Sequence, residues 1–218
     1  MTYSVKEIFY TLQGEGLQAG RAAVFCRFAG CNLWTGRESD RSQAVCQFCD
    51  TDFVGTDGTG GGKFETATAL AQAVKSHWPA MANDSSMAKP MVVLTGGEPG
   101  LQVDAALIHA LHHEGFFIAI ETNGSVVLPE GIDWVCVSPK AGAPWLQRQG
   151  HELKLVYPQP SLMPSQIEAQ TDLLFNHWLL QPMDSSQAVQ HTQAAIAHCQ
   201  AHPRWRLSVQ THKVLGIR

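Results

Sequence analysis

The segment that decides the fold is Met91-Val92-Val93-Leu94-Thr95-Gly96-Gly97-Glu98-Pro99, a short apolar run that ends in glycines and a carboxylate. The apolar part predicts a buried strand, and the polar part follows the carboxyl end of that strand. The same order returns at 116–124, where an apolar run ends in Glu121-Thr122-Asn123-Gly124. A strand followed by a polar strand end is therefore a repeated unit of this sequence.

We expect further strands of this kind on both sides of these two. One precedes them at 22–28, after an extended segment at 5–12, and four follow at 134–137, 153–157, 177–180 and 206–209. Nearly continuous apolar strands imply that both faces of the sheet are covered, so the pattern favours a parallel sheet with helices packed on it. Ligand sites in such folds lie outside the carboxyl ends of the strands.

Apolar residues at helical spacing predict three main helices, at 65–78, 101–114 and 185–202. In the last of them, the expected buried stripe consists of Val189, Thr192, Ile196 and Cys199. A complete barrel needs eight strand–helix units and typically about 250 residues. A chain of 218 residues with three such helices falls short of both. We therefore expect an α/β fold in the form of a partial parallel β/α barrel, with about six core strands.

The composition is that of one globular domain over residues 1–218, because 44% of the residues are hydrophobic and 16% are charged. The net charge of -4 and the scattered Lys and Arg residues argue against a strongly basic nucleic-acid surface. The sequence begins without a signal-like leader and has no apolar run of about 18 residues. We expect a cytoplasmic protein that binds neither nucleic acid nor membrane.

Three of the six cysteines, Cys31, Cys46 and Cys49, fall close together after the strand expected at 22–28. In a reducing compartment, such a cluster points to metal binding or catalysis rather than to disulfides. A closed zinc site needs four tetrahedral ligands, and an iron–sulfur cluster usually takes four thiolates. Three cysteines would leave one iron of a cluster without a protein ligand, open to a substrate or cofactor.

Other chemically suggestive residues have simpler interpretations. Cys26, Cys136 and Cys199 lie in apolar contexts, where free cysteines behave as small hydrophobic residues. His109 and His113 have the spacing of two metal ligands on one helix face, but the glutamate of the metalloprotease motif is missing. Because they lie opposite the apolar stripe, we expect a solvated face there.

Two features near the start of the sequence each allow two interpretations. Gln13-Gly14-Glu15-Gly16 is either a glycine turn in solvent or a loop that faces a ligand. In the second case, Glu15 could accept paired hydrogen bonds from an amidine-like ring edge. Arg27 is either a surface ion-pair partner or a fork for a carboxylate.

Together, the cysteine trio and the strand ends Thr95-Gly96-Gly97-Glu98-Pro99 and Glu121-Thr122-Asn123-Gly124 resemble radical S-adenosylmethionine (radical SAM) enzymes, which implies a partial barrel of the radical SAM type. More narrowly, five strings resemble the 7-carboxy-7-deazaguanine synthase family: Leu12-Gln13-Gly14-Glu15-Gly16, Cys49-Asp50-Thr51, Ser138-Pro139-Lys140, Gln181-Pro182-Met183-Asp184 and Gln210-Thr211-His212-Lys213. Their order and their placement at strand ends are specific, and the resemblance covers essentially the whole chain.

The resemblance implies conversion of 6-carboxy-5,6,7,8-tetrahydropterin to 7-carboxy-7-deazaguanine with loss of ammonia, in the biosynthesis of a queuosine precursor. It implies a 4Fe-4S cluster on Cys31, Cys46 and Cys49, S-adenosylmethionine on the open iron, and Mg²⁺ on Thr51. It also implies a reductant protein such as flavodoxin or ferredoxin, and a homodimer. The implied cofactor-binding residues are Phe48, Asp50, Gly97, Ser138, Pro139, Lys140, Gln181, Pro182, Met183 and Asp184. The implied pterin-binding residues are Leu12, Gln13, Gly14, Glu15, Arg27, Thr95, His212 and Arg218.

The cysteine spacing departs from that of the superfamily. Radical SAM enzymes usually place three residues and then two between their cysteines, whereas fourteen residues separate Cys31 from Cys46 here. We infer an insertion at about 32–45, which is tolerable because the entropy of loop closure grows only slowly with loop length. Cys26 competes with Cys31 for the first ligand position, but a mid-strand cysteine points less readily into the loop.

Two other classes of protein remain open. A radical SAM activating enzyme that makes a glycyl radical on a partner protein would be similarly small, but Gln13-Gly14-Glu15-Gly16 and Arg27 favour a small polar substrate. A non-catalytic zinc-binding module built on the cysteine trio and a histidine would leave the strand-end motifs unexplained.

Overall fold

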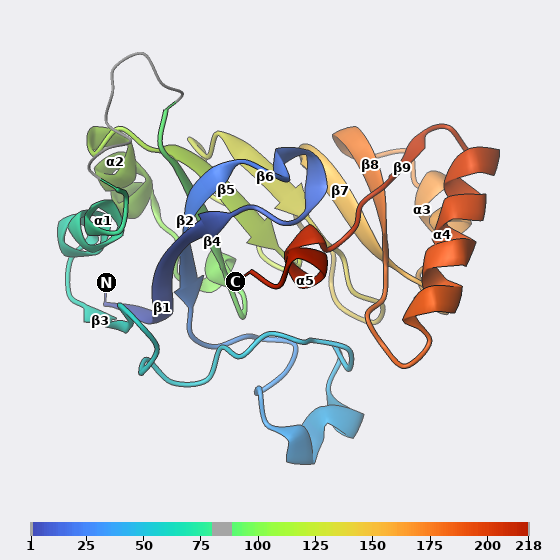
Figure 1. Ribbon diagram of the computed structural model, residues 1–218, viewed down its shortest axis with the longest axis horizontal. Coiled ribbons are helices and arrows are strands. Elements are labelled where there is room, and N and C mark those ends of the chain that lie inside the picture. Colours follow the sequence, from blue (N-terminus) through green and yellow to red (C-terminus); the bar gives the residue numbers. More distant parts are fainter. Residues whose placement is uncertain (1, 80–88, 218) are drawn as a thin grey trace.

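One nine-stranded sheet organises residues 2–79 and 89–217, the part of the chain that the computed structural model describes. Its strands are β1 (Tyr3–Leu12), β2 (Ala22–Phe28), β3 (Gly62–Phe64), β4 (Met91–Gly96), β5 (Phe117–Thr122), β6 (Trp134–Val137), β7 (Gln149–Tyr157), β8 (Leu174–Pro182) and β9 (Trp205–Leu207). They are ordered β3-β1-β2-β4-β5-β6-β7-β8-β9. The pairs from β2 to β9 are parallel, and β1 is antiparallel to both β2 and β3. The sheet is open (Figure 1), so the predicted α/β class and partial barrel are confirmed.

The three long helices cover opposite ends of this sheet (Figure 1). They are α1 (Ala67–Ser76), α2 (Ala105–His113) and α4 (Ala188–Ala201), and two short helices, α3 (Pro164–Glu168) and α5 (Thr211–Leu215), accompany them. Leu70 of α1 and Leu107 of α2 pack with Val92 and Leu94 of β4 in one core cluster. A second core cluster joins α3 and α4 to β7, β8 and β9. Burial of these apolar side chains is what fixes the helices to the sheet.

Side-chain caps explain where the first two long helices begin. The Thr66 side chain accepts a hydrogen bond from the backbone N–H of Ala69, and the Asp104 carboxylate accepts one from Leu107. Such N-caps satisfy donors that have no partner within the helix. The helices therefore begin two and four residues later than the predicted 65 and 101. Residues Pro99–Leu101 form a separate 3₁₀ turn instead.

The buried stripe predicted for the last helix is partly wrong. Val189 is 72% exposed, and the buried residue of α4 is Ala195. At about 100° per residue, Thr192 and Cys199 lie within about 60° of Ala195 around the helix axis, whereas Val189 lies about 120° away. Val189 is apolar but faces solvent, so counting it as a core residue rotated the predicted buried stripe away from the face that is buried.

The strand count also exceeds the prediction of about six core strands. Seven strands are parallel, and β1 and β3 extend the sheet on one side with antiparallel pairing. Of the nine, only β3 had not been expected, and it has just three residues. Strands of that length carry too few residues to show an alternating pattern. None of the helices in the described ranges has the length and hydropathy that crossing a membrane requires.

Candidate functional site

A cavity of about 410 Å³ opens at the carboxyl ends of the parallel strands. Small-molecule and cofactor sites commonly have volumes of about 300–1,000 Å³. The predicted site residues that line the cavity are Leu12, Gln13, Gly14, Glu15, Arg27, Cys31, Cys46, Phe48, Cys49, Asp50, Thr51, Thr95, Gly97, Ser138, Lys140, Gln181, Pro182, Met183, Asp184 and His212. Pro139 is not part of the lining, and Arg218 lies outside the described residues. One cavity thus brings together residues predicted for the cluster, the cofactor and the pterin.

The three clustered cysteines face this cavity, and Cys26 does not. Cys26 is fully buried within the core cluster that α1 and α2 cover, and burial raises the pKa of its thiol to about 12. Burial also raises the pKa values of Cys31 and Cys46. Backbone N–H groups of Leu33 and Trp34 oppose this rise at Cys31, and the Lys140 ammonium opposes it at Cys46. Cys31 and Cys46 therefore have groups beside them that stabilise thiolates, whereas Cys26 stays a neutral core residue.

Gly97 lets the loop that carries Cys31 approach the end of β4. A Cβ atom on Gly97 would lie 2.0 Å from the carbonyl oxygen of Gly30 and 2.9 Å from Cβ of Cys31. Two backbone hydrogen bonds hold this contact, from Gly97 N–H to Phe28 O at 3.2 Å and from Glu98 N–H to Gly30 O at 2.9 Å. Any other residue at position 97 would push the cysteine loop away.

The Glu98 carboxylate joins two of the strand-end motifs. It is fully buried and accepts hydrogen bonds from Thr122 Oγ1 at 2.7 Å, Asn123 N–H at 2.7 Å and Gly100 N–H at 2.8 Å. Burial raises the pKa of Glu98, while these donors oppose the rise. Glu98, from the motif at the end of β4, thus fixes the turn formed by the motif at the end of β5. The Asn123 side chain donates to Oδ1 of Asn32, the residue next to Cys31, at 3.2 Å.

The segment between Cys31 and Cys46 is braced by Arg41. Its Nη1 donates to the carbonyl oxygens of Gln47 and Cys49, each at 3.0 Å, and its guanidinium lies 4.0 Å from the centre of the Trp34 ring. Its Nε donates to the Glu38 carboxylate at 2.8 Å. A flat guanidinium can stack and donate several hydrogen bonds at once. This one side chain therefore links Trp34 and Glu38, which precede the second cysteine, to the backbone of Gln47 and Cys49.

Lys154 lies between two carboxylates in the cavity. Its Nζ is 2.5 Å from Glu15 Oε2 and 2.8 Å from Glu121 Oε2, and its side chain is only 5% exposed. Burial favours the neutral form of Glu15, but Lys154, Gln210 and Gln181 outweigh it and lower the pKa of Glu15 to about 2. Glu15 is therefore ionised at neutral pH and can act only as a hydrogen-bond acceptor.

Gln13 and Glu15 lie in the wall of the cavity rather than in a solvated turn. Gln13 is 5% exposed, its amide nitrogen donates to Glu121 Oε1 at 3.3 Å, and its amide oxygen accepts from Glu15 N–H at 3.1 Å. Lys140 also lines the cavity, and its Nζ donates to the carbonyl oxygen and the hydroxyl of Ser138. Burial lowers the pKa of Lys140, and the nearby Cys46 opposes that effect.

The helix α5 borders the cavity beside this loop. Thr211 N–H donates to Gly14 O at 2.9 Å, and the His212 ring packs so closely that a Cβ on Gly14 would lie 2.3 Å from its Nδ1. Lys213 forms ion pairs with both Asp50 and Asp184. The string from Gln210 to Lys213 thus connects the first loop, the cysteine segment and the end of β8.

Arg27 has a partner already. Its Nε lies 2.9 Å from Glu7 Oε1, and both side chains are less than one-fifth exposed, at 18% and 15%. Arg27 nevertheless lines the cavity. The sequence left open whether Arg27 is an ion-pair partner or a fork for a carboxylate. Its position is compatible with both roles.

Of the cavity residues Lys154, Glu121 and Gln210, sequence reasoning did not mention the first and gave the other two only as parts of motifs, without a role of their own. A signal for the first was present, since a lysine within the apolar strand Gln149–Tyr157 must find a buried partner. The partners themselves could not be inferred, because Glu15 lies 139 residues away in sequence.

An open parallel sheet with a cysteine trio at the carboxyl ends of its strands places the chain in the radical SAM class of enzymes. It is 61% identical over 217 residues to the 7-carboxy-7-deazaguanine synthase of Caulobacter vibrioides and 60% identical over 217 residues to that of Bordetella pertussis, with 100% of each chain covered in both cases. The chain belongs to the 7-carboxy-7-deazaguanine synthase family.

A solved structure has the same fold. The crystal structure of QueE from Escherichia coli superposes with a TM-score of 0.71 at 27% sequence identity, covering 97% of this chain and 95% of that one. No family model matches the chain.

Proposed function

We propose that the chain is a radical SAM lyase that converts 6-carboxy-5,6,7,8-tetrahydropterin to 7-carboxy-7-deazaguanine with loss of ammonia, in the biosynthesis of a queuosine precursor. The observation that carries the proposal is the single cavity in which Cys31, Cys46 and Cys49 meet the residues expected around the cofactor and the pterin. Similarity over the full length to proteins named 7-carboxy-7-deazaguanine synthase supports it.

The cysteine trio fits a 4Fe-4S cluster. All three thiols are free and line one cavity, and backbone N–H groups lie beside Cys31 and Cys46. Hydrogen bonds to the sulfurs and limited solvent exposure are what proteins use to tune such clusters. Cys31, Cys46 and Cys49 would hold three of the irons and leave the fourth to S-adenosylmethionine. When bound, the cluster and S-adenosylmethionine supply the electron and the radical chemistry that no side chain can provide.

The chain itself would position S-adenosylmethionine and keep water out. The aromatic wall of the cavity includes Trp34 and Phe53, which are 8% and 1% exposed. The residues proposed to hold S-adenosylmethionine are Phe48, Asp50, Gly97, Ser138, Pro139, Lys140, Gln181, Pro182, Met183 and Asp184. Pro139 would act indirectly, by shaping the turn between Ser138 and Lys140, because it does not line the cavity.

The pterin would bind beside the buried charges. Glu15, held ionised by Lys154, would accept hydrogen bonds from the N–H groups of the ring edge. Arg27 would face the substrate carboxylate, together with Mg²⁺ held by the Thr51 hydroxyl, since Mg²⁺ keeps few protein ligands in such sites. The other residues proposed to surround the pterin are Leu12, Gln13, Gly14, Thr95, His212 and, beyond the described residues, Arg218.

The two alternative classes have less support. The relatives from Caulobacter vibrioides and Bordetella pertussis are named 7-carboxy-7-deazaguanine synthase, not glycyl-radical activating enzyme. A zinc-binding module would leave unexplained the strand-end residues that share the cavity with the cysteine trio.

The test is anaerobic reconstitution with iron and sulfide, followed by incubation with S-adenosylmethionine, a reductant and the carboxytetrahydropterin. We expect deazaguanine product by mass spectrometry and release of ammonia. An intact cluster with cleavage of S-adenosylmethionine but no deazaguanine product would refute the substrate assignment. Stoichiometric zinc without sulfide in the anaerobically purified protein would refute the radical SAM assignment.

We further propose that residues 1–218 act as one domain, with the segment at about 32–45 as an insertion in the cluster loop. A flavodoxin or ferredoxin would be the reductant, and the enzyme would be a cytoplasmic homodimer. Light scattering of the purified protein tests the dimer, and product formation with each reduced protein tests the electron donor.

A further inference from the structure

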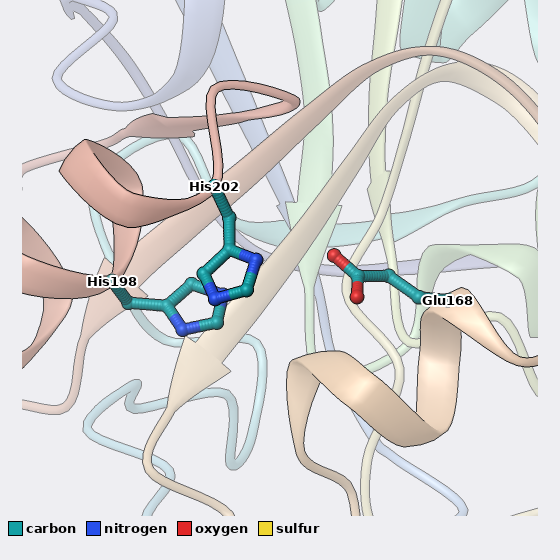
Figure 2. A group of neighbouring side chains, drawn as sticks. All are labelled: Glu168, His198 and His202. Atoms are coloured by element: carbon teal, nitrogen blue, oxygen red, sulfur yellow. The ribbon is translucent and has the colours of Figure 1, made fainter.

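Two histidines and a glutamate face one another on the side of the molecule formed by α3 and α4. Figure 2 shows the carboxylate of Glu168, at the end of α3, directed toward the imidazoles of His198 and His202 at the end of α4. One ligand atom from each residue lies within 4.8 Å of those from the other two. Within the described residues, no other group of three or more His, Cys, Asp or Glu side chains meets this distance criterion. None of the three lines the cavity described above.

The side chains are of the kinds that bind zinc. Imidazole nitrogens and carboxylate oxygens bind Zn²⁺ at about 2.0–2.2 Å, and two histidines with one glutamate make a known three-ligand set with one open position. The spacing of His198 and His202 places both imidazoles on one side of the end of α4, and their ring centres lie 4.3 Å apart. The planes of the two rings are 17° apart, so a metal ion between them and Glu168 would require the rings to turn toward it.

The carboxylate is already oriented by a buried neighbour. The indole N–H of Trp205, which is 2% exposed, donates to Glu168 Oε1 at 2.7 Å. This bond fixes one carboxylate oxygen and leaves the other for a ligand. Metal-binding carboxylates in proteins are commonly held in this way by an outer hydrogen bond.

His198 supplies a second, independent observation. Its Nε2 is buried and has no hydrogen-bond partner among the described residues. A buried polar atom without a partner is costly, and native proteins usually satisfy such atoms with protein groups, water or an ion. A metal ion bound at this nitrogen would satisfy it.

We propose that Glu168, His198 and His202 form a binding site for a divalent transition-metal ion of the zinc type, with water in the remaining position. The ion would join the end of α3 to the end of α4, beside β9. It would be a structural ion, separate from the iron–sulfur cluster and from any magnesium ion at the pterin. The proposal does not depend on the proposed reaction.

The experiment is an anaerobic calorimetric titration of untagged, cluster-loaded protein with Zn²⁺. Loading the cluster first occupies the cavity thiols, and iron content before and after the titration shows that the cluster remains intact. We expect one zinc site in the wild-type protein, with affinity reduced at least about tenfold in both H202Q and E168Q. Zinc should also raise the melting temperature of the wild-type protein but not that of the two variants.

A matched control is available on α2. His109 and His113 have the same spacing as His198 and His202 and are exposed, and among residues 2–79 and 89–217 no third ligand forms a group with them. The double variant H109Q/H113Q should bind zinc as the wild type does. Absence of zinc binding at a free concentration of about 1 mM, or equal binding by wild type, H202Q and E168Q, would overturn the proposal. An affinity loss in the α2 control equal to that in H202Q would also overturn it, because it would indicate binding by exposed histidine pairs in general.

Discussion

Replacing Lys154 with methionine tests how the buried charges of the cavity are held. Lys154 Nζ lies 2.5 Å from Glu15 Oε2 and 2.8 Å from Glu121 Oε2, and the lysine side chain is 5% exposed. Methionine has a similar length and no charge. K154M would leave two carboxylates close together without a cation between them.

The expected loss of stability can be worked out in two ways. Removing one partner of a buried ion pair costs about 3–5 kcal/mol. Independently, burial favours the neutral form of Glu15, but Lys154 and the amides of Gln210 and Gln181 prevail and lower its pKa from 4.5 to about 2. A difference of that size corresponds to about 3 kcal/mol. For a protein of this length, a loss of 3–5 kcal/mol lowers the melting temperature by about 6–20 °C.

The same pKa sets the pH dependence. Because the pKa of Glu15 is lower in the folded state than in the unfolded state, its stabilising contribution is complete above pH 4.5 and is lost as the pH falls toward 2. In K154M, burial without the cation raises the pKa of Glu15. The difference in stability between wild type and K154M should therefore shrink as the pH falls below 4.5.

The assay is urea unfolding of the cluster-free, reduced protein, followed by circular dichroism at pH 7 and pH 4. Lys6→Met is the control, since Lys6 pairs with Asp52 and Asp57, whose side chains are 71% and 82% exposed. Surface pairs of this kind contribute little, so K6M should unfold close to the wild type. The reasoning is refuted if K154M unfolds at the same urea concentration as the wild type at pH 7, or if its deficit is unchanged at pH 4.

Three further predictions concern the cysteines, the loop contact and a helix cap. Cys31→Ala should abolish iron and sulfide binding after anaerobic reconstitution, and Cys26→Ala should retain it. The reverse result would show that Cys26, not Cys31, is the first cluster ligand. Gly97→Ala places a Cβ 2.0 Å from Gly30 O and should lower iron content severalfold with an unchanged far-ultraviolet spectrum; full iron content would contradict this. Thr66→Ala should lower the free energy of unfolding by about 1 kcal/mol in urea titrations through loss of the α1 cap, with Ser76→Ala, at the other end of α1, as a near-neutral control.

The sequence predicted those elements of the fold whose burial shows in the residue types. Met91–Gly96 begins with four fully buried apolar residues, and such a run is visible without knowing its neighbours. Gly62–Phe64 has no such run and becomes a strand only because Tyr3 to Val5 pairs with it. The exposed Val189 misled the prediction for α4, since hydrophobic residues also occur on protein surfaces.

The candidate site also has one part that could be predicted from the sequence and another that could not. The cysteines and the strand ends could be predicted because parallel strands bring their carboxyl ends to one edge of the sheet. The Lys154 network could not, because the residues that neutralise the lysine lie 33 and 139 positions away and meet it only in the folded chain. Pairings of that kind depend on strand order, which no local pattern specifies.

The bracing by Arg41 has a consequence for how this cysteine loop could change length. Shortening the segment between Cys31 and Cys46 to three residues would remove Arg41, and with it the hydrogen bonds to the carbonyl oxygens of Gln47 and Cys49. Trp34 would lose the guanidinium stacked on its ring. A natural or engineered deletion would therefore need compensating substitutions around Cys49 in the same step. The length of the segment and the support of the last cysteine would have to evolve together.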